Sequence, residues 1–579
     1  FHYFGISDLW VDTQEDISDM DVSFSNLSTK ERVDKIIEKI RYFGHSGSRV
    51  KGLVFCANRI EAKELSDAFN ERGAYRTICL TGEDSQEIRE KAIARLTGTG
   101  EYQGRIDEQL DYIFTVDIFN EDVDIPEINQ VIMLRQTESP IIFIQQLGRG
   151  LRKFEDKEYV VILDFIGNYN NNFMIPVALS GDRSYNADVI RKYVISGNST
   201  IPGASTVHFD EISKDKIFKS IDKIKGMKTL IKESYVSLKN RLGRVPLLYD
   251  FYENQEIDPL VIIREYKTYD AFMVAMEQDK YKNVLNEQEK LTLEYLSKTV
   301  LSGVRPDELV ILSQLLHRDH IEVADFIREY QNTYGIEIST SRVKEAIQVL
   351  QGHFVSKEAE YQKYCQIDIL ENDSAGMIKR LQSYTERLTH IPFYTQVEDI
   401  IKVGIARYKE KYLPGLKSED PFVLYEKYSR RDVSLLMNCG KDLSSIMYGM
   451  KRIENDVFIF ITYHKEESQD EKNYVDGKPD YADAFEDNLI FKWDSQIGKG
   501  LDSSYMKDVL EADRKHLFVK KSDAETSFYY MGQFDVLEAR NAQKEDNRGR
   551  MQPITKVTMK MHHAVREDLL RYLQSHITA

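Results

Sequence analysis

Two arginines close behind a glycine form the strongest candidate in this sequence for a site that binds an anion. In the stretch IQQLGRGLRK, Gly148 precedes Arg149, Arg152 follows three residues later, and Gln145 stands three residues before the glycine. On a helix, residues three apart project from nearly one face. Two guanidinium groups there can form bidentate bonds to phosphate oxygens. The pattern therefore marks a candidate phosphate site. The alternative, which stays open, is a solvated arginine pair at a helix end.

Alternating strand and helix patterns surround this candidate site. Apolar, β-branched runs of strand length alternate with amphipathic stretches that carry helix caps, such as Ser85 before one helix and Gly73 after another. The predicted strands are 50–57, 75–82, 110–119, 128–135 and 159–167, and the predicted helices are 58–73, 85–98 and 141–153. Strands that alternate with helices in this way form a parallel sheet with helices on both faces.

The rest of the chain predicts two further regions, so the expected fold class is multidomain: α/β, then all-α, then β-rich. Helix formers dominate residues 206–428, which indicates a helical coupler without internal repeats. Strand patterns return in residues 429–579, where PITKVTMKM alternates polar and apolar positions. Short strands separated by turns favour a barrel-like domain. We therefore expect three domains, at 1–205, 206–428 and 429–579.

Length and composition limit the class of protein. With 579 residues, 42% of them hydrophobic, the chain can form several globular domains. No run of about 18 apolar residues occurs, so we expect no membrane span. The four cysteines lie far apart, which favours a reducing, cytoplasmic setting and predicts no metal site. Because the net charge is −17, affinity for nucleic acid must come from local basic groups.

Four segments, in order and suitably spaced, resemble the motifs of the second RecA-like domain in superfamily 2 helicases and translocases. VFCANRIEA (54–62) is similar to the fourth motif, TVDIFNEDVDIPEI (115–128) to the fifth and QQLGRGLR (145–152) to the sixth, and CLTGED (79–84) lies between the first two. The whole order looks like bacterial helicase-like proteins related to type III and type IV restriction enzymes. The remainder resembles the long C-terminal extension of that group, which is often fused to a nuclease domain.

The resemblance implies roles in ATP hydrolysis for the arginine pair and its neighbours. Arg149 would be the arginine finger on the γ-phosphate, where it neutralises charge in the transition state, and Arg152 would support it. Gln145 would sense the nucleotide and Gly148 would lie beside it. Asp124 would face the ribose or the interface between RecA-like domains.

The same resemblance implies contacts with nucleic acid. Thr115 and the backbone near Thr81 and Gly82 would contact the nucleic-acid backbone. One residue departs from the pattern: Asp122 stands where the family usually has glycine. Since only glycine lacks a Cβ, a side chain there narrows a loop that must approach its ligand closely.

The motifs that hold the phosphates of ATP are absent from this sequence. It contains no GxxxxGK[ST] and no DEAD- or DEAH-like acidic box. These motifs cradle phosphate and Mg²⁺, so we expect ATP and Mg²⁺ to bind mainly to a missing first RecA-like domain. The start at Phe1, without Met, looks like a cut through a longer protein. We expect this chain to be inactive alone.

The C-terminal region carries a second candidate site, in LIFKWDSQIGKGL (489–501). Trp493 is expected at a strand end, followed by Ser495, Gln496 and Lys499. An aromatic ring can stack on an unpaired base, serine and glutamine can bond to a base edge, and lysine can hold phosphate. The alternative is that the aromatic residue belongs to the core, as most strand aromatics do. With the resemblance, this pattern predicts a DNA reader, with methylated cytosine as the hypothesised target.

Three functions remain open. The leading one is the motor-half, coupler and DNA-recognition part of a restriction or defence ATPase that acts on DNA, expected to be duplex. The second is a DNA-repair helicase whose C-terminal domain binds a protein partner. The third is a scaffold that has lost catalysis, against which the pair Arg149 and Arg152 argues.

Overall fold

The computed structural model describes most of the chain. The described residues are 1–8, 30–116, 125–135, 154, 157–167, 169, 171–180, 182–183, 185, 190–191, 193–194, 206–222, 227–372, 376–416, 420–463, 474–475, 478–479, 483–521, 525–546 and 549–574. The chain divides into two compact units, residues 1–230 and residues 231–579. The two units are described separately below.

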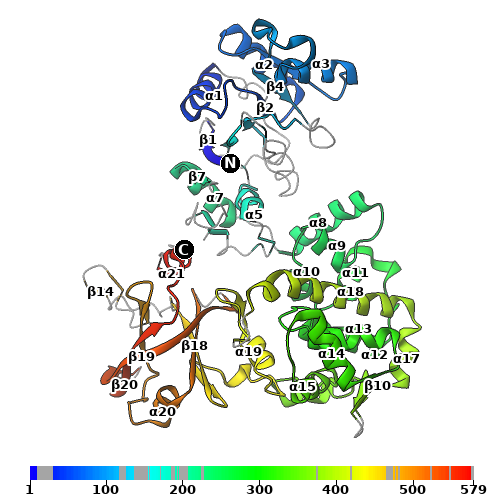
Figure 1. Cartoon of the computed structure of the whole chain (residues 1–579), viewed down its shortest axis with the longest axis vertical. Helices are drawn as coiled ribbons and strands as arrows, with labels where there is room; N and C mark the ends of the chain where they lie inside the picture. The colour runs from blue at the N-terminus through cyan, green and yellow to red at the C-terminus, as the bar shows by residue number, and fades with distance from the viewer. Residues whose placement is uncertain are drawn as a thin grey trace. The chain divides into compact units, whose positions relative to one another are not determined.

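The first unit is built on a seven-stranded parallel sheet with the strand order β3-β4-β2-β5-β6-β1-β7 (Figure 1). Its strands are β1 (His2–Ser7), β2 (Gly52–Phe55), β3 (Thr77–Leu80), β4 (Tyr112–Thr115), β5 (Gln130–Met133), β6 (Val161–Ile166) and β7 (Thr206–Phe209). Its helices include α1 (Lys30–Phe43), α2 (Arg59–Glu71), α3 (Gln86–Thr97), α5 (Met174–Ser180) and α7 (Glu211–Asp222). The predicted parallel sheet with helices is therefore confirmed.

Both faces of this sheet are covered, because successive residues of a strand point to opposite faces. On β2, Leu53 and Phe55 belong to one buried cluster, which also contains residues of α3, α5 and α7. Val54 belongs to the other cluster, with residues of α1 and α2. Helix ends follow the predicted caps: the Ser85 side chain accepts a hydrogen bond from Ile88 N at the start of α3.

The edge of the sheet that holds β1 and β7 differs from the sequence prediction. No strand was predicted for the segment FHYFGIS, but β1 lies inside the sheet, between β6 and β7. Residues 206–209, expected to open the helical region, form β7. The reason is physical: strand pairing joins segments about 160–200 residues apart here, and no local pattern encodes such a partner.

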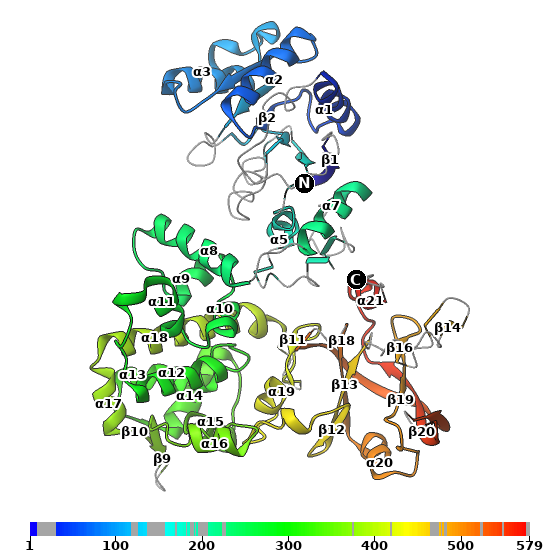
Figure 2. The same ribbon diagram turned by 180° about the vertical axis from the view of Figure 1, so that it is seen from behind.

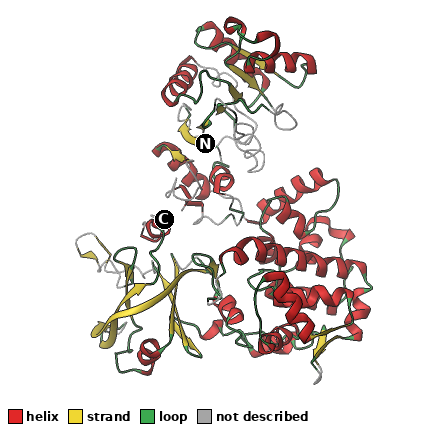
Figure 3. Ribbon diagram, viewed as in Figure 1, coloured by secondary structure: helices red, strands yellow, loops and turns green. Residues whose placement is uncertain are grey.

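The second unit begins with a helical region. Its elements are α8 (Met227–Leu242), α9 (Leu248–Glu253), α10 (Pro259–Tyr266), α11 (Tyr269–Glu277), α12 (Glu287–Thr299), α13 (Asp307–His317), β8 (His320–Glu322), α14 (Val323–Tyr334), α15 (Thr340–Leu350), α16 (Glu358–Tyr364), β9 (Leu370–Asn372), β10 (Met377–Arg380), α17 (Gln382–Leu388) and α18 (Ile391–Arg407). Three short strands form a small antiparallel sheet in the order β8-β10-β9. Figure 3 shows how strongly helices dominate this region.

The remainder of the second unit is a mixed sheet in the order β12-β13-β18-β19-β20-β17-β16, with β11 paired to β19 (Figure 2). Its elements are β11 (Lys427–Tyr428), α19 (Arg430–Leu436), β12 (Met450–Ile453), β13 (Asp456–Thr462), β16 (Ala484–Phe485), β17 (Ile490–Asp494), α20 (Ser504–Glu511), β18 (Arg514–Lys520), β19 (Phe528–Glu545), β20 (Met551–Met561) and α21 (Glu567–Gln574), with a separate pair β14 (Tyr474–Val475) and β15 (Lys478–Pro479). Among the described strands of this sheet, β13 and β18 pair in parallel and the other pairs are antiparallel. The hydrogen-bonded strands run in order from β12 to β16. The prediction that this sheet closes into a barrel stays a prediction.

One core joins the helical region to the mixed sheet. On β13, Val457 and Ile459 face a cluster that includes residues of α20 and α21. Phe458 and Phe460 face the opposite cluster, which also contains helical-region residues such as Tyr408. The helical region and the sheet therefore share apolar packing within one unit. No helix among the described residues is long and apolar enough to cross a bilayer.

Candidate nucleotide and nucleic-acid interface

The carboxyl ends of β2, β3 and β4 lie side by side along one edge of the parallel sheet. In open parallel sheets this edge is where ligands bind. It carries the turns that follow β2 and β3, which belong to the segments 54–62 and 79–84 of the predicted motifs. The fold thus brings segments from three parts of the sequence to a single edge.

The turn after β3 is partly exposed and is held by hydrogen bonds. The Asp84 carboxylate accepts a hydrogen bond from Thr81 N at 2.6 Å, and Arg89 Nη2 donates to Gly82 O at 2.9 Å. A Cβ built on Gly82 would meet only Arg59 Nη2, at 3.9 Å. A ligand backbone could therefore approach Gly82 closely. Thr81 already uses its own N–H on Asp84, so its predicted contact with nucleic acid would have to be made by other atoms.

Thr115 ends β4 and is fully buried. Its Oγ1 has no hydrogen-bond partner among the described residues. A buried hydroxyl without a partner is costly, so this atom is one that a neighbouring chain segment or a ligand would satisfy. The predicted contact between Thr115 and a nucleic-acid backbone stays a prediction.

The residues of the predicted ATP site lie outside the described part of the chain. They are Asp124, Gln145, Gly148, Arg149 and Arg152, and Asp122 lies outside it as well. The described part continues past β5 to Arg135 and resumes at Phe154 and at residues 157–167. The roles of the arginine pair therefore stay predictions.

A buried ionic cluster at the same edge was missed by the sequence analysis. Arg32 of α1 bonds to Asp8 just after β1, with Nη2 2.8 Å from Oδ2, and to Glu61 of α2, with Nη1 2.7 Å from Oε1. Arg32 and Glu61 are each 1% exposed. The other Glu61 oxygen accepts a hydrogen bond from Ala57 N at 2.7 Å. The cluster ties β1, α1 and the start of α2 together.

The two carboxylates of this cluster keep the Arg32 guanidinium protonated. Burial by itself would lower the pKa of the guanidinium, but the charges of Asp8 and Glu61 outweigh it and raise that pKa. Burial raises the pKa of Glu61 against the opposing effect of Arg32. The signal in the sequence was the position of Arg32, four residues before buried Ile36 on the apolar stripe of α1.

The second candidate site lies in the mixed sheet. Trp493 is 4% exposed and packs in the core cluster beside α20, with its ring centroid 6.4 Å from that of Tyr505. Its neighbours Lys492 and Asp494 point to the other face of β17, as alternation requires. The polar neighbours that suggested an exposed ring therefore belong to the opposite face. To stack on a base, the indole would have to leave the core.

Ser495 is also buried, and its hydroxyl is already used. Ser495 Oγ donates to Lys499 O at 2.7 Å and accepts a hydrogen bond from Thr555 N at 2.8 Å. By contrast, Gln496 is exposed and its Nε2 donates to Tyr448 O at 3.0 Å. Lys499 is half-buried, with Nζ 5.8 Å from the centroid of the Tyr505 ring. Of the four predicted residues, Gln496 and Lys499 are therefore the ones that solvent reaches.

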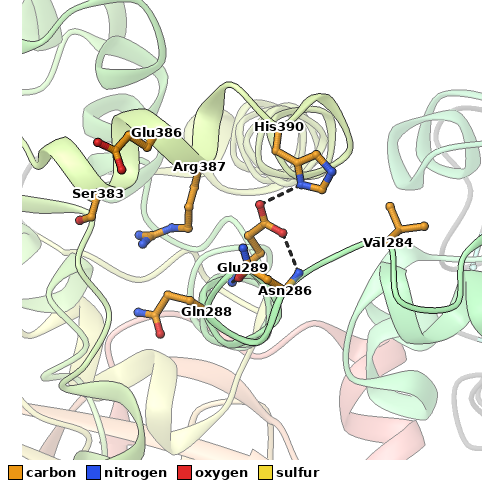
Figure 4. Close-up of a pocket in the computed structure, with 8 residues that line it drawn as sticks. All are labelled: Val284, Asn286, Gln288, Glu289, Ser383, Glu386, Arg387 and His390. Carbon is orange, nitrogen blue, oxygen red and sulfur yellow. Dashed lines mark hydrogen bonds and ion pairs between the residues drawn. The ribbon is translucent and has the colours of Figure 1, made fainter.

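A pocket of about 530 Å³ lies in the helical region, at the start of α12 against α17 and α18 (Figure 4). Its lining residues are Val284, Asn286, Gln288, Glu289, Ser383, Glu386, Arg387 and His390. The Glu289 carboxylate accepts a hydrogen bond from Asn286 N and lies 2.8 Å from His390 Nδ1. Arg387 pairs with Asp368 at 2.6 Å. The Glu289 contacts cap α12 and link it to the start of α18. Most of the polar groups that line the pocket therefore already have structural partners.

Within the described ranges, no group of three histidine, cysteine, aspartate or glutamate side chains is arranged to hold a metal ion. The four cysteines are free thiols, and burial raises the pKa of Cys56 well above its ordinary value.

Comparison with known families agrees with the sheet and its motifs. Residues 31–153 match the family described as "Helicase conserved C-terminal domain". Residues 231–412 match "Domain of unknown function (DUF8090)", and residues 422–573 match "Domain of unknown function (DUF3427)". The match to a helicase C-terminal domain lies within the first unit of the chain.

A curated relative points the same way. The protein named "Putative ATP-dependent helicase IRC3" from Saccharomyces cerevisiae is 26% identical over 160 residues, which are 28% of this chain. The match spans only about a fifth of that relative, 22% of its length. The matched region therefore resembles part of a helicase-like ATPase. The activity of the whole protein is left to the proposal below.

Two solved structures illustrate how partial the likeness is. The E. coli DEAD-box protein SrmB, bound to regulator of ribonuclease activity A, is 18% identical, with 29% of this chain and 76% of that chain covered and a TM-score of 0.21. The yeast DEAD-box splicing factor Prp28 is 15% identical, with 37% and 36% covered and a TM-score of 0.25. At these identities and TM-scores, the likenesses add nothing to the family match.

Proposed function

We propose that this chain is the second half of the motor, together with the coupler and the DNA-recognition domain, of a nucleic-acid-dependent ATPase. The observation that carries the proposal is the match of residues 31–153 to a helicase C-terminal domain, together with the turns after β2 and β3 at the carboxyl edge of a parallel sheet. ATP and Mg²⁺ would bind mainly to a first RecA-like domain. This chain would add Arg149 as the group that neutralises charge on the γ-phosphate, supported by Arg152.

The test of this proposal is DNA-stimulated ATP hydrolysis by a protein that joins this chain to a first RecA-like domain. Arg149→Ala is expected to lower turnover roughly 10³- to 10⁵-fold, because the transition state loses its arginine finger. The control is Arg105→Ala, which removes an exposed arginine of the same unit that pairs with Glu108 at 3.7 Å. Turnover that is equal in Arg149→Ala and in the control would contradict the proposal.

The proposal extends to the chain by itself. Without the phosphate-binding motifs, we expect negligible hydrolysis from it. Mg²⁺-dependent ATP turnover by this chain alone, abolished by Arg149→Ala, would mean that this chain contains a complete active site. The proposal that a first RecA-like domain supplies the phosphate-binding motifs would then be wrong.

The finer part of the proposal concerns what the mixed-sheet domain recognises. We propose that it reads duplex DNA in a restriction or defence enzyme, with methylated cytosine as the target. Gln496 and Lys499, which solvent reaches, support a polar contact at this domain. The buried positions of Trp493 and Ser495 mean that neither carries the contact in the conformation described.

A further inference from the structure

Arg430 occupies an unusual position for a charged residue at the rim of the mixed-sheet domain. It is the first residue of α19, and the Ser429 and Asp432 side chains cap that helix in a reciprocal pair. The Arg430 guanidinium carbon lies 5.2 Å from the centroid of the Tyr448 ring, 5.6 Å from that of Phe460 and 5.1 Å from that of Phe528. The guanidinium group is thus held by aromatic rings instead of by a carboxylate.

No acceptor satisfies this guanidinium within the described part of the chain. Arg430 Nε is buried without a hydrogen-bond partner, and no ion pair or hydrogen bond of the Arg430 side chain occurs among the described residues. Burial without a counter-ion lowers the pKa of Arg430 from its ordinary value. Arg430 as a whole is half-buried, so Nε is the donor that burial leaves unmet, and an unmet buried donor is costly. The neighbouring Arg431 makes the contrast plain, since it pairs with Asp442 at 3.1 Å.

The aromatic rings around Arg430 differ in a way that matters for binding. Phe460 and Phe528 are buried, at 5% and 2% exposure, and they belong to the core. Tyr448 is 64% exposed, although a ring of that size is usually covered in a folded domain. Lys520 adds a second positive charge, with Nζ 5.4 Å from the centroid of the Phe528 ring. The exposed Tyr448 ring therefore lies beside the Arg430 guanidinium, whereas Lys520 lies over the buried Phe528 ring and donates to Glu525 O at 2.9 Å.

The loop that carries Tyr448 is fixed by its neighbours. Tyr448 O accepts hydrogen bonds from Met450 N at 2.9 Å and from Gln496 Nε2 at 3.0 Å. Gly449 follows with a φ of +74°, and Phe460 N donates to Gly449 O at 2.7 Å. Gln496, predicted as a base contact, thus binds the backbone carbonyl of the residue that carries the exposed ring.

From this geometry we infer that Arg430 and Tyr448 bind one unpaired nucleotide of a DNA strand, with a phosphate on the Arg430 guanidinium and the base stacked on the Tyr448 ring. Phosphate oxygens supply the paired acceptors that a forked guanidinium requires, and a base supplies the flat face that an exposed aromatic ring requires. The inference rests on the proposed function of the mixed-sheet domain. It moves the contact from buried Trp493 to exposed Tyr448, and it makes the substrate an unpaired or flipped nucleotide.

The experiment is fluorescence anisotropy of the full chain with a labelled single-stranded oligonucleotide and with an abasic oligonucleotide of the same length. Tyr448→Ala is expected to weaken binding of the normal oligonucleotide roughly 5- to 150-fold, the range for one stacked base. Tyr448→Phe keeps the ring and should bind like the wild type. Arg430→Ala should weaken binding of both oligonucleotides, because both have phosphates, whereas the effect of Tyr448→Ala should vanish on the abasic strand.

Two controls separate binding from folding and from charge. Arg452→Ala removes an arginine of the same domain that is already paired, with Nη1 3.2 Å from Asp508 Oδ1, and should leave affinity unchanged. Because Tyr448 is mostly exposed, Tyr448→Ala should fold even if Arg430→Ala does not, and thermal melts will check both.

Each outcome decides something. If Tyr448→Ala and Arg430→Ala bind the oligonucleotide with the same affinity as the wild type and Arg452→Ala, this inference is wrong and the proposed function still stands. A Tyr448 effect that persists on the abasic strand would overturn base stacking. If the wild type binds neither strand nor duplex at low salt, DNA recognition itself fails, and the exposed rim would then fit a protein partner.

Discussion

Among single residues, Arg32 gives the clearest prediction of stability. Arg32→Ala would leave two buried carboxylates, Asp8 and Glu61, without their shared cation. Breaking a buried pair from one side typically costs about 3–5 kcal/mol. We therefore expect a large loss in the free energy of unfolding of the first unit, measured by chemical denaturation. Arg72→Ala, which removes a partly exposed pair with Asp34, should cost below about 1 kcal/mol. Equal losses in the two variants would contradict the account.

A second residue predicts how stability depends on pH. Asp164 is 2% exposed in β6 and accepts a hydrogen bond from the Tyr3 hydroxyl at 2.5 Å. Burial raises the pKa of Asp164 from 3.8 to about 7. The folded state therefore holds a proton that the unfolded state has released between about pH 4 and pH 7, so this carboxyl lowers stability as pH rises through that window.

Asp164→Asn tests this dependence, because the amide cannot ionise and its oxygen can still accept from Tyr3. Relative to wild type, the variant should gain stability as pH rises from about 4 to 7, reaching up to about 4 kcal/mol. Below about pH 4 the two proteins should be alike. The measurement is the midpoint of thermal unfolding of both proteins across this range, and a constant difference at all pH values would rule the explanation out.

Among elements, the turn between Tyr448 and β12 is specified by one glycine. Gly449 has a φ of +74°, and a Cβ there would lie 2.6 Å from Gln496 Nε2. Gly449→Ala should therefore combine backbone strain of about 1–2 kcal/mol with displacement of the Gln496 amide. Gly498→Ala is the matched control, since Gly498 has a φ of +85° and open space around it. Gly449→Ala should lower the melting temperature more than Gly498→Ala does, and the reverse order would refute this reasoning.

Sequence patterns specified the local elements well and their partners poorly. The strands and caps around β2, β3 and α3 follow from apolar runs and from Ser85, because these signals are contained in a few neighbouring residues. The place of β1 inside the sheet and the burial of Trp493 depend on pairing with distant strands, as Trp493 pairs with Val557. Arg430 was missed for the same reason, since its three aromatic neighbours come from separate segments.

For the whole molecule, the shared core predicts that the second unit folds as one. Helical-region residues such as Val349 and Tyr408 lie in a cluster with Phe458 and Phe518 of the mixed sheet. A fragment of residues 231–416 would expose that apolar surface, so it should melt at a lower temperature than a fragment of residues 231–579 and bind more of a hydrophobic dye. If the shorter fragment melts at the same temperature, the helical region has a sufficient core of its own.

The proposed recognition of modified DNA by this chain is tested by one titration. Matched duplexes, unmodified and carrying methylated cytosine, would be titrated by fluorescence anisotropy at two salt concentrations. The account predicts a preference for the methylated duplex of at least about tenfold, 1.4 kcal/mol, that persists at the higher salt. Equal affinities that fall together with salt would mean phosphate contacts alone and would contradict recognition of a modified base.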